Sequence, residues 1–112
     1  MDNPKRDILI GLSIFIIEII LLYYLWKNSL ILTAALLVIS IYVLFGWADR
    51  EEKFVYFAGF ALGPVVDLTL VPTGIWSYGN PTILGVPIWL PPAYAIGAVI
   101  MVKVGKSIAK IF

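Results

Sequence analysis

Four long apolar stretches alternate with short polar segments along the 112-residue chain. The stretches cover residues 8–26, 30–47, 54–71 and 83–102. A helix needs roughly 20 apolar residues to cross a hydrocarbon core about 30 Å thick. The pattern therefore predicts an all-α integral membrane protein, with four transmembrane helices in a single transmembrane domain.

Proline and glycine interrupt the fourth stretch and the segment before it. They recur between residues 72 and 87, and Pro91 and Pro92 follow. Proline lacks a backbone N–H donor and clashes with the preceding helical turn, although it suits the first turn of a helix. We expect a broken outer segment, followed by a fourth helix that begins at about residue 91.

The composition favours lipid over water as the main solvent of the protein. Hydrophobic residues make up 62% of the chain and charged residues only 13%, about half of the charged share in an ordinary soluble domain. The net charge of +1 gives no basic field for nucleic acid. Cysteine and histidine do not occur, which excludes disulfides, imidazole bases and nearly every zinc or haem site. We therefore expect no metal site and no cofactor.

The positive charges fall mainly on one side of the predicted bundle. In a four-span chain the N-terminus, the polar loop at residues 48–53 and the C-terminus share one side. That side carries Lys5, Arg6, Arg50, Lys53, Lys103, Lys106 and Lys110, and the other side carries only Lys27. Because cytoplasmic loops are enriched in lysine and arginine, both termini of this cell-membrane protein should be cytoplasmic. The acids of the polar loop should be solvated, and the last three lysines should meet anionic headgroups.

Small residues at helical spacing predict how the last two helices pack. Gly59, Gly63 and Asp67 recur at every fourth position and share one helical face. Ala93 and Gly97 repeat this spacing in the last stretch. Small residues let membrane helices approach closely, so these two faces should pack against each other.

Two carboxylates fall inside the apolar stretches. Glu18 lies ten residues beyond Ile8, and Asp67 lies 14 residues beyond Lys53, at depths of about 15 Å and about 21 Å. A charged side chain there costs at least about 2.5 kcal/mol. Glu18 could act as a proton carrier or general acid, or could bond to hydroxyls of the second helix at Thr33, Ser40 or Tyr42. Asp67 could act on a ligand, or could be purely structural, as a helix cap or as a hydrogen-bonding group between helices.

Four aromatic side chains near the outer segment could line a cavity beside Asp67. They are Trp76, Tyr78, Trp89 and Tyr94. Each combines a flat apolar ring with a polar edge. The alternative, for Trp89 and Tyr94 in particular, is an ordinary aromatic belt at the membrane surface.

Residues 63–92 carry a recurring pattern of glycine, proline and aromatic residues in "GPVVD", "PTGIWSY" and "GVPIWLPP". This block resembles stretches in carotenoid-pathway membrane proteins of the lycopene cyclase and carotenoid hydratase type, and in small membrane proteins related to them. The resemblance implies a helical membrane fold and an isoprenoid or lipid-like ligand. It also implies that Asp67 protonates an alkene, with Trp76, Tyr78 and Trp89 facing the carbocation.

The leading hypothesis is a site for a hydrophobic lipid or isoprenoid, in an enzyme or in an accessory protein. It predicts that Asp67→Asn abolishes binding or turnover. A second resemblance is to the small multidrug resistance transporters, which are dimers; it rests on chain length and on an isolated glutamate, here Glu18, in the first span. A third possibility is a subunit without a ligand that forms a homodimer or associates with another membrane protein.

Overall fold

The computed structural model describes residues 3–74, 77–78 and 87–112, and every regular element within them is helical. Four helices follow one another along the chain. They are α1 (Pro4–Leu25), α2 (Ser29–Tyr42), α3 (Arg50–Leu70) and α4 (Leu90–Ile111). A π-helical turn, Val43–Trp47, extends α2, and a 3-10 turn, Val71–Thr73, extends α3. This confirms the predicted all-helical class.

Within the described part of the chain, three helical segments are long and apolar enough to cross a membrane. These segments are Pro4–Leu25, Ser29–Trp47 and Arg50–Thr73. Helix α4 has 22 residues and carries three lysines in its second half, and it is not among these three segments.

Local capping determines where three helices begin. The side chains of Asn3 and Asn28 accept hydrogen bonds from backbone N–H groups in the first turns of α1 and α2. Asp49 and Glu52 form a reciprocal capping box at the start of α3, a common way to satisfy the free N–H groups of a helix terminus. Residues 50–53, which we expected in a polar loop, therefore form the first turn of α3.

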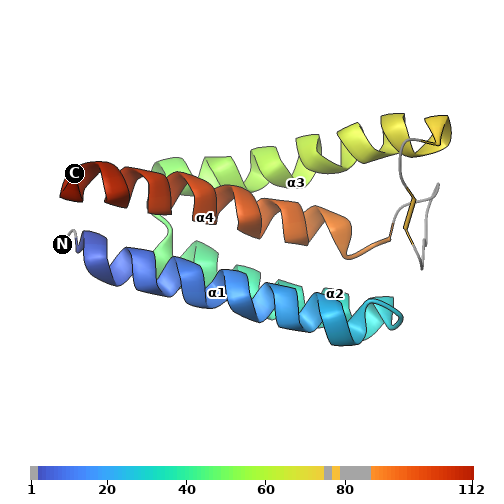
Figure 1. Ribbon diagram of the computed structural model, residues 1–112, viewed down its shortest axis with the longest axis horizontal. Helices are drawn as coiled ribbons and strands as arrows, with labels where there is room; N and C mark the ends of the chain where they lie inside the picture. The colour runs from blue at the N-terminus through green and yellow to red at the C-terminus, as the bar shows by residue number, and fades with distance from the viewer. Residues whose placement is uncertain (1–2, 75–76, 79–86) are drawn as a thin grey trace.

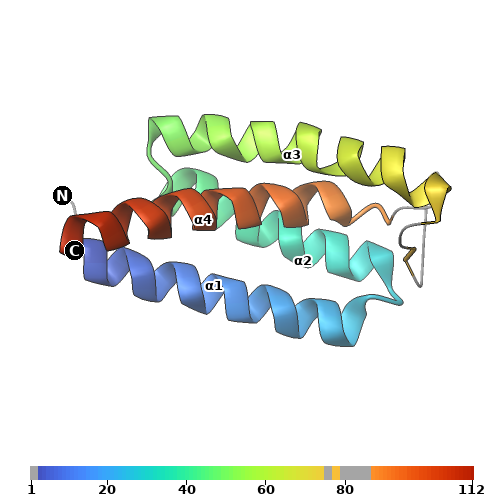
Figure 2. The same ribbon diagram turned by 45° about the horizontal axis from the view of Figure 1, so that its top comes forward.

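Helix α4 occupies the centre of the bundle. It packs against α3, α1 and α2, and Figure 2 shows it in front of α2 and between α1 and α3. The two termini lie at the same end of the molecule (Figure 1). The buried core consists of Ile14, Leu32, Leu36, Val43, Trp47, Tyr56, Ala95, Ile96, Val99 and Ile100. Four of these residues come from α4, and four come from α2 with its π-helical extension.

The contact between α3 and α4 is as close as glycine permits. A Cβ atom added to Gly59 would lie 2.9 Å from the Cβ of Ala98, and one added to Gly63 would overlap the side chain of Tyr94. On α4 the geometry differs from our expectation. Gly97 would accept a Cβ with nothing within 4 Å, because the face that meets α3 lies around Tyr94 and Ala98, one residue beyond the Ala93 and Gly97 face that we predicted.

Candidate functional site

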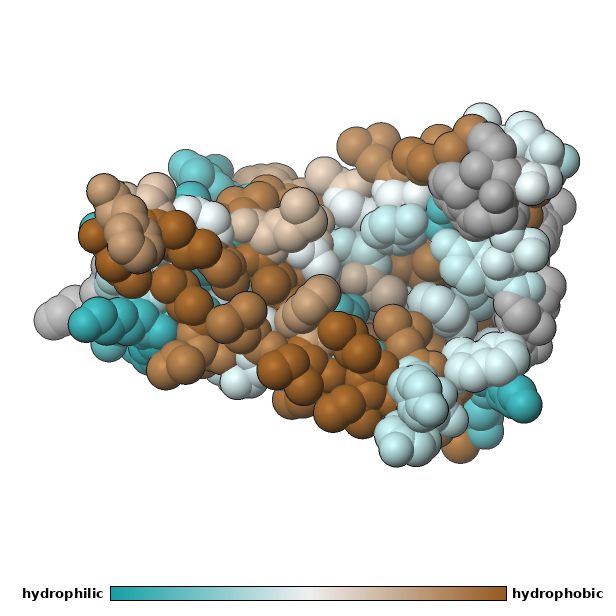
Figure 3. Space-filling model, viewed as in Figure 1, coloured by the Kyte–Doolittle hydropathy of each residue, from teal (hydrophilic) through white to brown (hydrophobic). Residues whose placement is uncertain are grey.

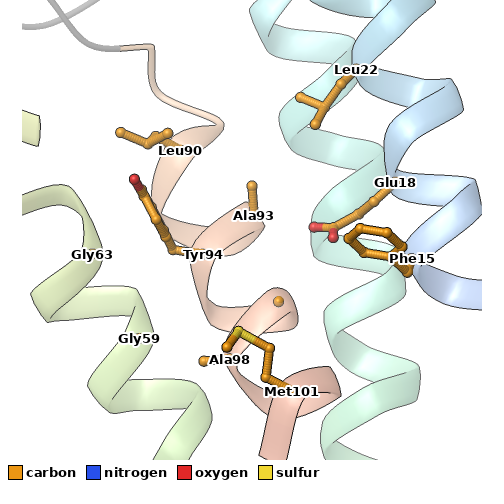
Figure 4. Close-up of a pocket in the computed structure, with 11 residues that line it drawn as sticks. Phe15, Glu18, Leu22, Gly59, Gly63, Leu90, Ala93, Tyr94, Ala98 and Met101 are labelled. Carbon is orange, nitrogen blue, oxygen red and sulfur yellow. The ribbon is translucent and has the colours of Figure 1, made fainter. Parts of the chain in front are cut away.

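A cavity of about 370 Å³, open to the surface of the bundle beside the exposed side chains of Phe15 and Met101, lies between α1, α3 and α4. This volume is within the range of roughly 300–1,000 Å³ typical of ligand pockets. Its lining comprises Phe15, Glu18 and Leu22 of α1, Gly59 and Gly63 of α3, and Leu90, Ala93, Tyr94, Gly97, Ala98 and Met101 of α4. Figure 4 shows these side chains around the space. Glu18 and Tyr94 carry the polar groups of this lining, and its other members are apolar or glycine.

Small residues leave this space open. Gly59 and Gly63 of α3 and Gly97 of α4 line the cavity without side chains. Phe15, Glu18 and Leu22 face them from α1, at the spacing of three and four that places residues on one side of a helix. Larger residues at the glycine positions would extend toward α4 or into the cavity.

Glu18 lies on the α1 wall, and its carboxyl group points toward α4 (Figure 4). The residue is only 6% exposed. Its Oε1 atom is buried and has no hydrogen-bond partner within the described structure. A buried polar atom without a partner is uncommon, because the loss of hydration is not compensated. The hydrogen-bonding capacity of this oxygen is therefore not used by the residues that the structure describes.

The hydroxyl groups that we expected to bind Glu18 are engaged elsewhere. Thr33 donates to the carbonyl of Ser29 at 2.6 Å, and Ser40 donates to the carbonyl of Leu36 at 2.9 Å. Serine and threonine in a helix often bond in this way to the carbonyl four residues earlier. Tyr42 is exposed on α2. These contacts therefore do not support the alternative in which Glu18 bonds to hydroxyl groups of the second helix.

Asp67 forms a second polar centre and is completely buried. Its Oδ2 atom accepts hydrogen bonds from the hydroxyl of Tyr78 at 2.6 Å and from the hydroxyl of Tyr94 at 3.1 Å. Its Oδ1 atom has no partner among the residues that the structure describes. Asp67 does not belong to the cavity lining, whereas Tyr94 belongs to both groups. Tyr94 thus connects Asp67 to the cavity that Glu18 faces.

The predicted aromatic residues are only partly brought together. Tyr78 packs edge-to-face on Trp89, with ring centroids 6.1 Å apart, and Tyr78 and Tyr94 both bind Asp67. Trp76 lies outside the described residues. The Nε1 atom of Trp89 is buried without a partner in the described chain. Three of the four aromatics therefore cluster around Asp67, but only Tyr94 also contacts the cavity.

An ion-pair network at the end of the bundle that holds the termini was not expected from the sequence. Glu52 is 1% exposed, and its Oε1 atom lies 2.8 Å from the Nζ atom of Lys103. The Nζ atom of Lys106 lies 3.0 Å from Oε2 and 3.3 Å from Asp49; the contact with Oε2 is an ion pair outside hydrogen-bond geometry. Both lysines therefore bind acids of α3, which we had expected to be solvated. Glu52 and Lys103 are 51 positions apart, so no local signal predicted their pairing.

Some cavity residues did have a signal in the sequence. Phe15 and Leu22 share a helical face with Glu18, so their place beside it follows from spacing. Leu90, Ala98 and Met101 had no such signal, because their position depends on how α4 is rotated against its neighbours.

No protein-family model, curated protein or solved structure matches the chain. The resemblance of residues 63–92 to carotenoid-pathway proteins therefore stays a prediction.

Proposed function

We propose that this is a multi-pass membrane protein that binds a hydrophobic lipid or isoprenoid molecule in the cavity between α1, α3 and α4. One observation carries the proposal: a cavity of about 370 Å³ with an almost wholly apolar lining has a single carboxylate, Glu18, on its wall. Ligand pockets commonly combine many apolar contacts with a few placed polar groups. The ligand is either held or converted there.

The distribution of apolar surface supports insertion in a membrane. Large hydrophobic side chains are exposed along α1, α2 and α3, among them Leu9, Tyr24, Leu30 and Phe45. On the face in Figure 3, brown hydrophobic residues dominate the middle of α1, and the largest teal patches lie toward the ends. The longest extent of the molecule is 43 Å, which suits a bilayer of about 40–45 Å with its headgroups.

In this proposal α4 is the fourth span. Its 22 residues extend over about 33 Å, and the other three helices surround it. Lys103 and Lys106 near its end are paired with acids of α3, which reduces the cost of placing them near the membrane surface. The termini lie together at this end, and the excess of lysine and arginine puts this end in the cytoplasm.

Each polar residue has a separate role in the proposed site. Glu18 contacts the ligand. Tyr94 forms part of the cavity wall, and Asp67 positions Tyr94 through the hydrogen bond of 3.1 Å. This assignment moves the ligand contact from Asp67, where the sequence pattern suggested it, to Glu18.

Filling the cavity tests the proposal. Gly97 lines the cavity, and a Cβ there would meet nothing within 4 Å, so Gly97→Leu should fill the space without displacing a helix. Gly105→Leu is a matched control, because Gly105 has equally open surroundings but does not line the cavity.

The measurement is mass spectrometry of the lipids retained by each purified protein. We expect the wild type and Gly105→Leu to retain the same specific hydrophobic molecule and Gly97→Leu to lose it. The proposal fails if the wild type carries only the bulk lipids of the membrane, or if all three proteins retain the same molecule.

A second candidate is a proton-coupled transporter, favoured by the buried and unpartnered carboxyl group of Glu18 beside a cavity. This function predicts uptake into proteoliposomes driven by a pH gradient and abolished by Glu18→Gln. If no hydrophobic cation accumulates in response to the gradient, the transporter is excluded.

A further inference from the structure

We infer that the molecule bound in this cavity is a hydrophobic alcohol, whose hydroxyl group hydrogen-bonds to Glu18. The inference rests on the proposed function and names the ligand class for the same site. It follows from the chemistry of the cavity wall around Glu18.

The first step is the number of polar contacts that the cavity offers. Glu18 contributes a buried Oε1 atom without a partner in the described chain. The other polar side chain is Tyr94, whose hydroxyl proton is already donated to Asp67. All remaining lining residues are apolar or glycine. The ligand should therefore carry one polar group at Glu18 and hydrocarbon elsewhere.

The second step is the kind of polar group. A hydroxyl group can both donate and accept a hydrogen bond, so it can pair with Glu18 whether the carboxyl group is protonated or ionised. An ammonium group only donates, and pairing it would require a buried ionised carboxylate, which is costly to remove from water. An ether or a plain hydrocarbon has no donor. Of these four groups, the alcohol alone can pair with Glu18 in either protonation state.

The third step is the expected selectivity. A ligand without the donor would leave the Oε1 atom of Glu18 unpaired, and an unsatisfied buried acceptor costs roughly tenfold or more in affinity. The discrimination should disappear when the carboxyl group is removed. Glu18→Leu is suitable for this, because it replaces the carboxyl group by an apolar side chain in an apolar wall.

The probes are farnesol, its methyl ether and farnesylamine, which share one isoprenoid chain and differ only in the polar group. Binding to the full-length protein in detergent is measured by native mass spectrometry. The wild type, Glu18→Leu and the cavity-filling Gly97→Leu are compared, with size-exclusion chromatography to check folding. We expect the wild type to prefer farnesol to its methyl ether at least about tenfold, and Glu18→Leu to bind both equally.

Three results would count against the inference, and they have different meanings. If the wild type binds farnesol and its ether equally, and Gly97→Leu abolishes both, the cavity binds hydrophobic chains but the alcohol assignment is wrong. If farnesylamine is preferred and Glu18→Leu removes that preference, the ligand is a cation. If no probe binds in a manner sensitive to Gly97→Leu, the proposed function itself fails. If Glu18→Leu does not fold, the relative affinities of the wild type for farnesol, its methyl ether and farnesylamine still test the alcohol assignment.

Discussion

The hydroxyl group of Tyr94 on α4 donates a hydrogen bond of 3.1 Å to the Oδ2 atom of Asp67 on α3, across 27 positions of the chain. Tyr94 also forms part of the wall of the cavity that Glu18 faces. The hydrogen bond between Asp67 and Tyr94 therefore helps to position a side chain that forms part of the cavity wall. Among the described residues that bond to Asp67, Tyr94 is the one that lines the cavity.

The two tyrosine hydroxyls should stabilise the buried Asp67 cooperatively. Removing one of them in Tyr94→Phe or Tyr78→Phe should lower the free energy of unfolding by about 1–2 kcal/mol, because the other donor remains. The double variant leaves a buried carboxylate without a donor from either ring, so its loss should exceed the sum of the single losses. Unfolding in mixed micelles measures these values. Strictly additive losses would contradict the shared role.

The glycine contact between α3 and α4 should tolerate no added methyl group. A Cβ at Gly59 would lie 2.9 Å from that of Ala98 and 3.2 Å from the Cα atom of Ala95, so Gly59→Ala should destabilise the protein by about 1–3 kcal/mol. Gly105→Ala, in open space, should gain up to about 1 kcal/mol from the better helix former. Thermal unfolding of both variants checks this, and equal midpoints would show that the helices can separate at no cost.

Lys103 should stabilise the fold through Glu52. Its side chain is 12% exposed and that of Glu52 is 1% exposed, and the Lys103 ammonium also lies 5.2 Å from the centroid of the Trp47 ring. Loss of one partner from a buried pair typically costs about 3–5 kcal/mol. Because Lys106 still contacts Glu52, we expect Lys103→Met to cost about 2–3 kcal/mol.

A double-mutant cycle with Glu52→Gln isolates this pair, since glutamine keeps an oxygen for the capping bond with the Asp49 backbone N–H. The exposed Lys53→Met is the control, with an expected change within about 0.5 kcal/mol. A coupling energy near zero would mean that Lys103 acts without Glu52.

The stability of the end of the bundle that holds the termini should depend on pH through Asp49, which precedes the third span. Burial alone would raise the pKa of Asp49, but the Glu52 backbone N–H and the Lys106 ammonium outweigh it and lower this pKa.

A lowered acid pKa stabilises the fold above the usual value of 3.8, and this contribution is lost as the pH falls through the folded pKa. In Asp49→Asn the stability should therefore fall less on acidification than in the wild type, whereas the exposed control Glu51→Gln should behave like the wild type. Unfolding midpoints across pH test this, and parallel acid limbs for the wild type and both variants would refute it.

The sequence by itself determined the helical class, the order of the helices and the starts of α2 and α4. These features are local: long apolar stretches predict helices that can span a membrane, and the second stretch begins at residue 30, one position after the start of α2 at Ser29. Pro91 and Pro92 placed the start of the last helix near residue 91, and α4 begins at Leu90. Each of these features depends on residues close together in the chain and does not depend on how the helices pack.

Only the tertiary structure decided which faces meet. Gly59 and Gly63 contact the side of α4 that carries Tyr94 and Ala98. Glu18 lines the cavity, whereas Asp67 does not line it and is connected to it by its hydrogen bond with Tyr94. When a helix is apolar on nearly every side, its sequence gives little indication of which side packs against other helices and which side faces lipid. The rotation of the helices is set when all four pack together around the smallest side chains, and that packing also brings Lys103 to Glu52.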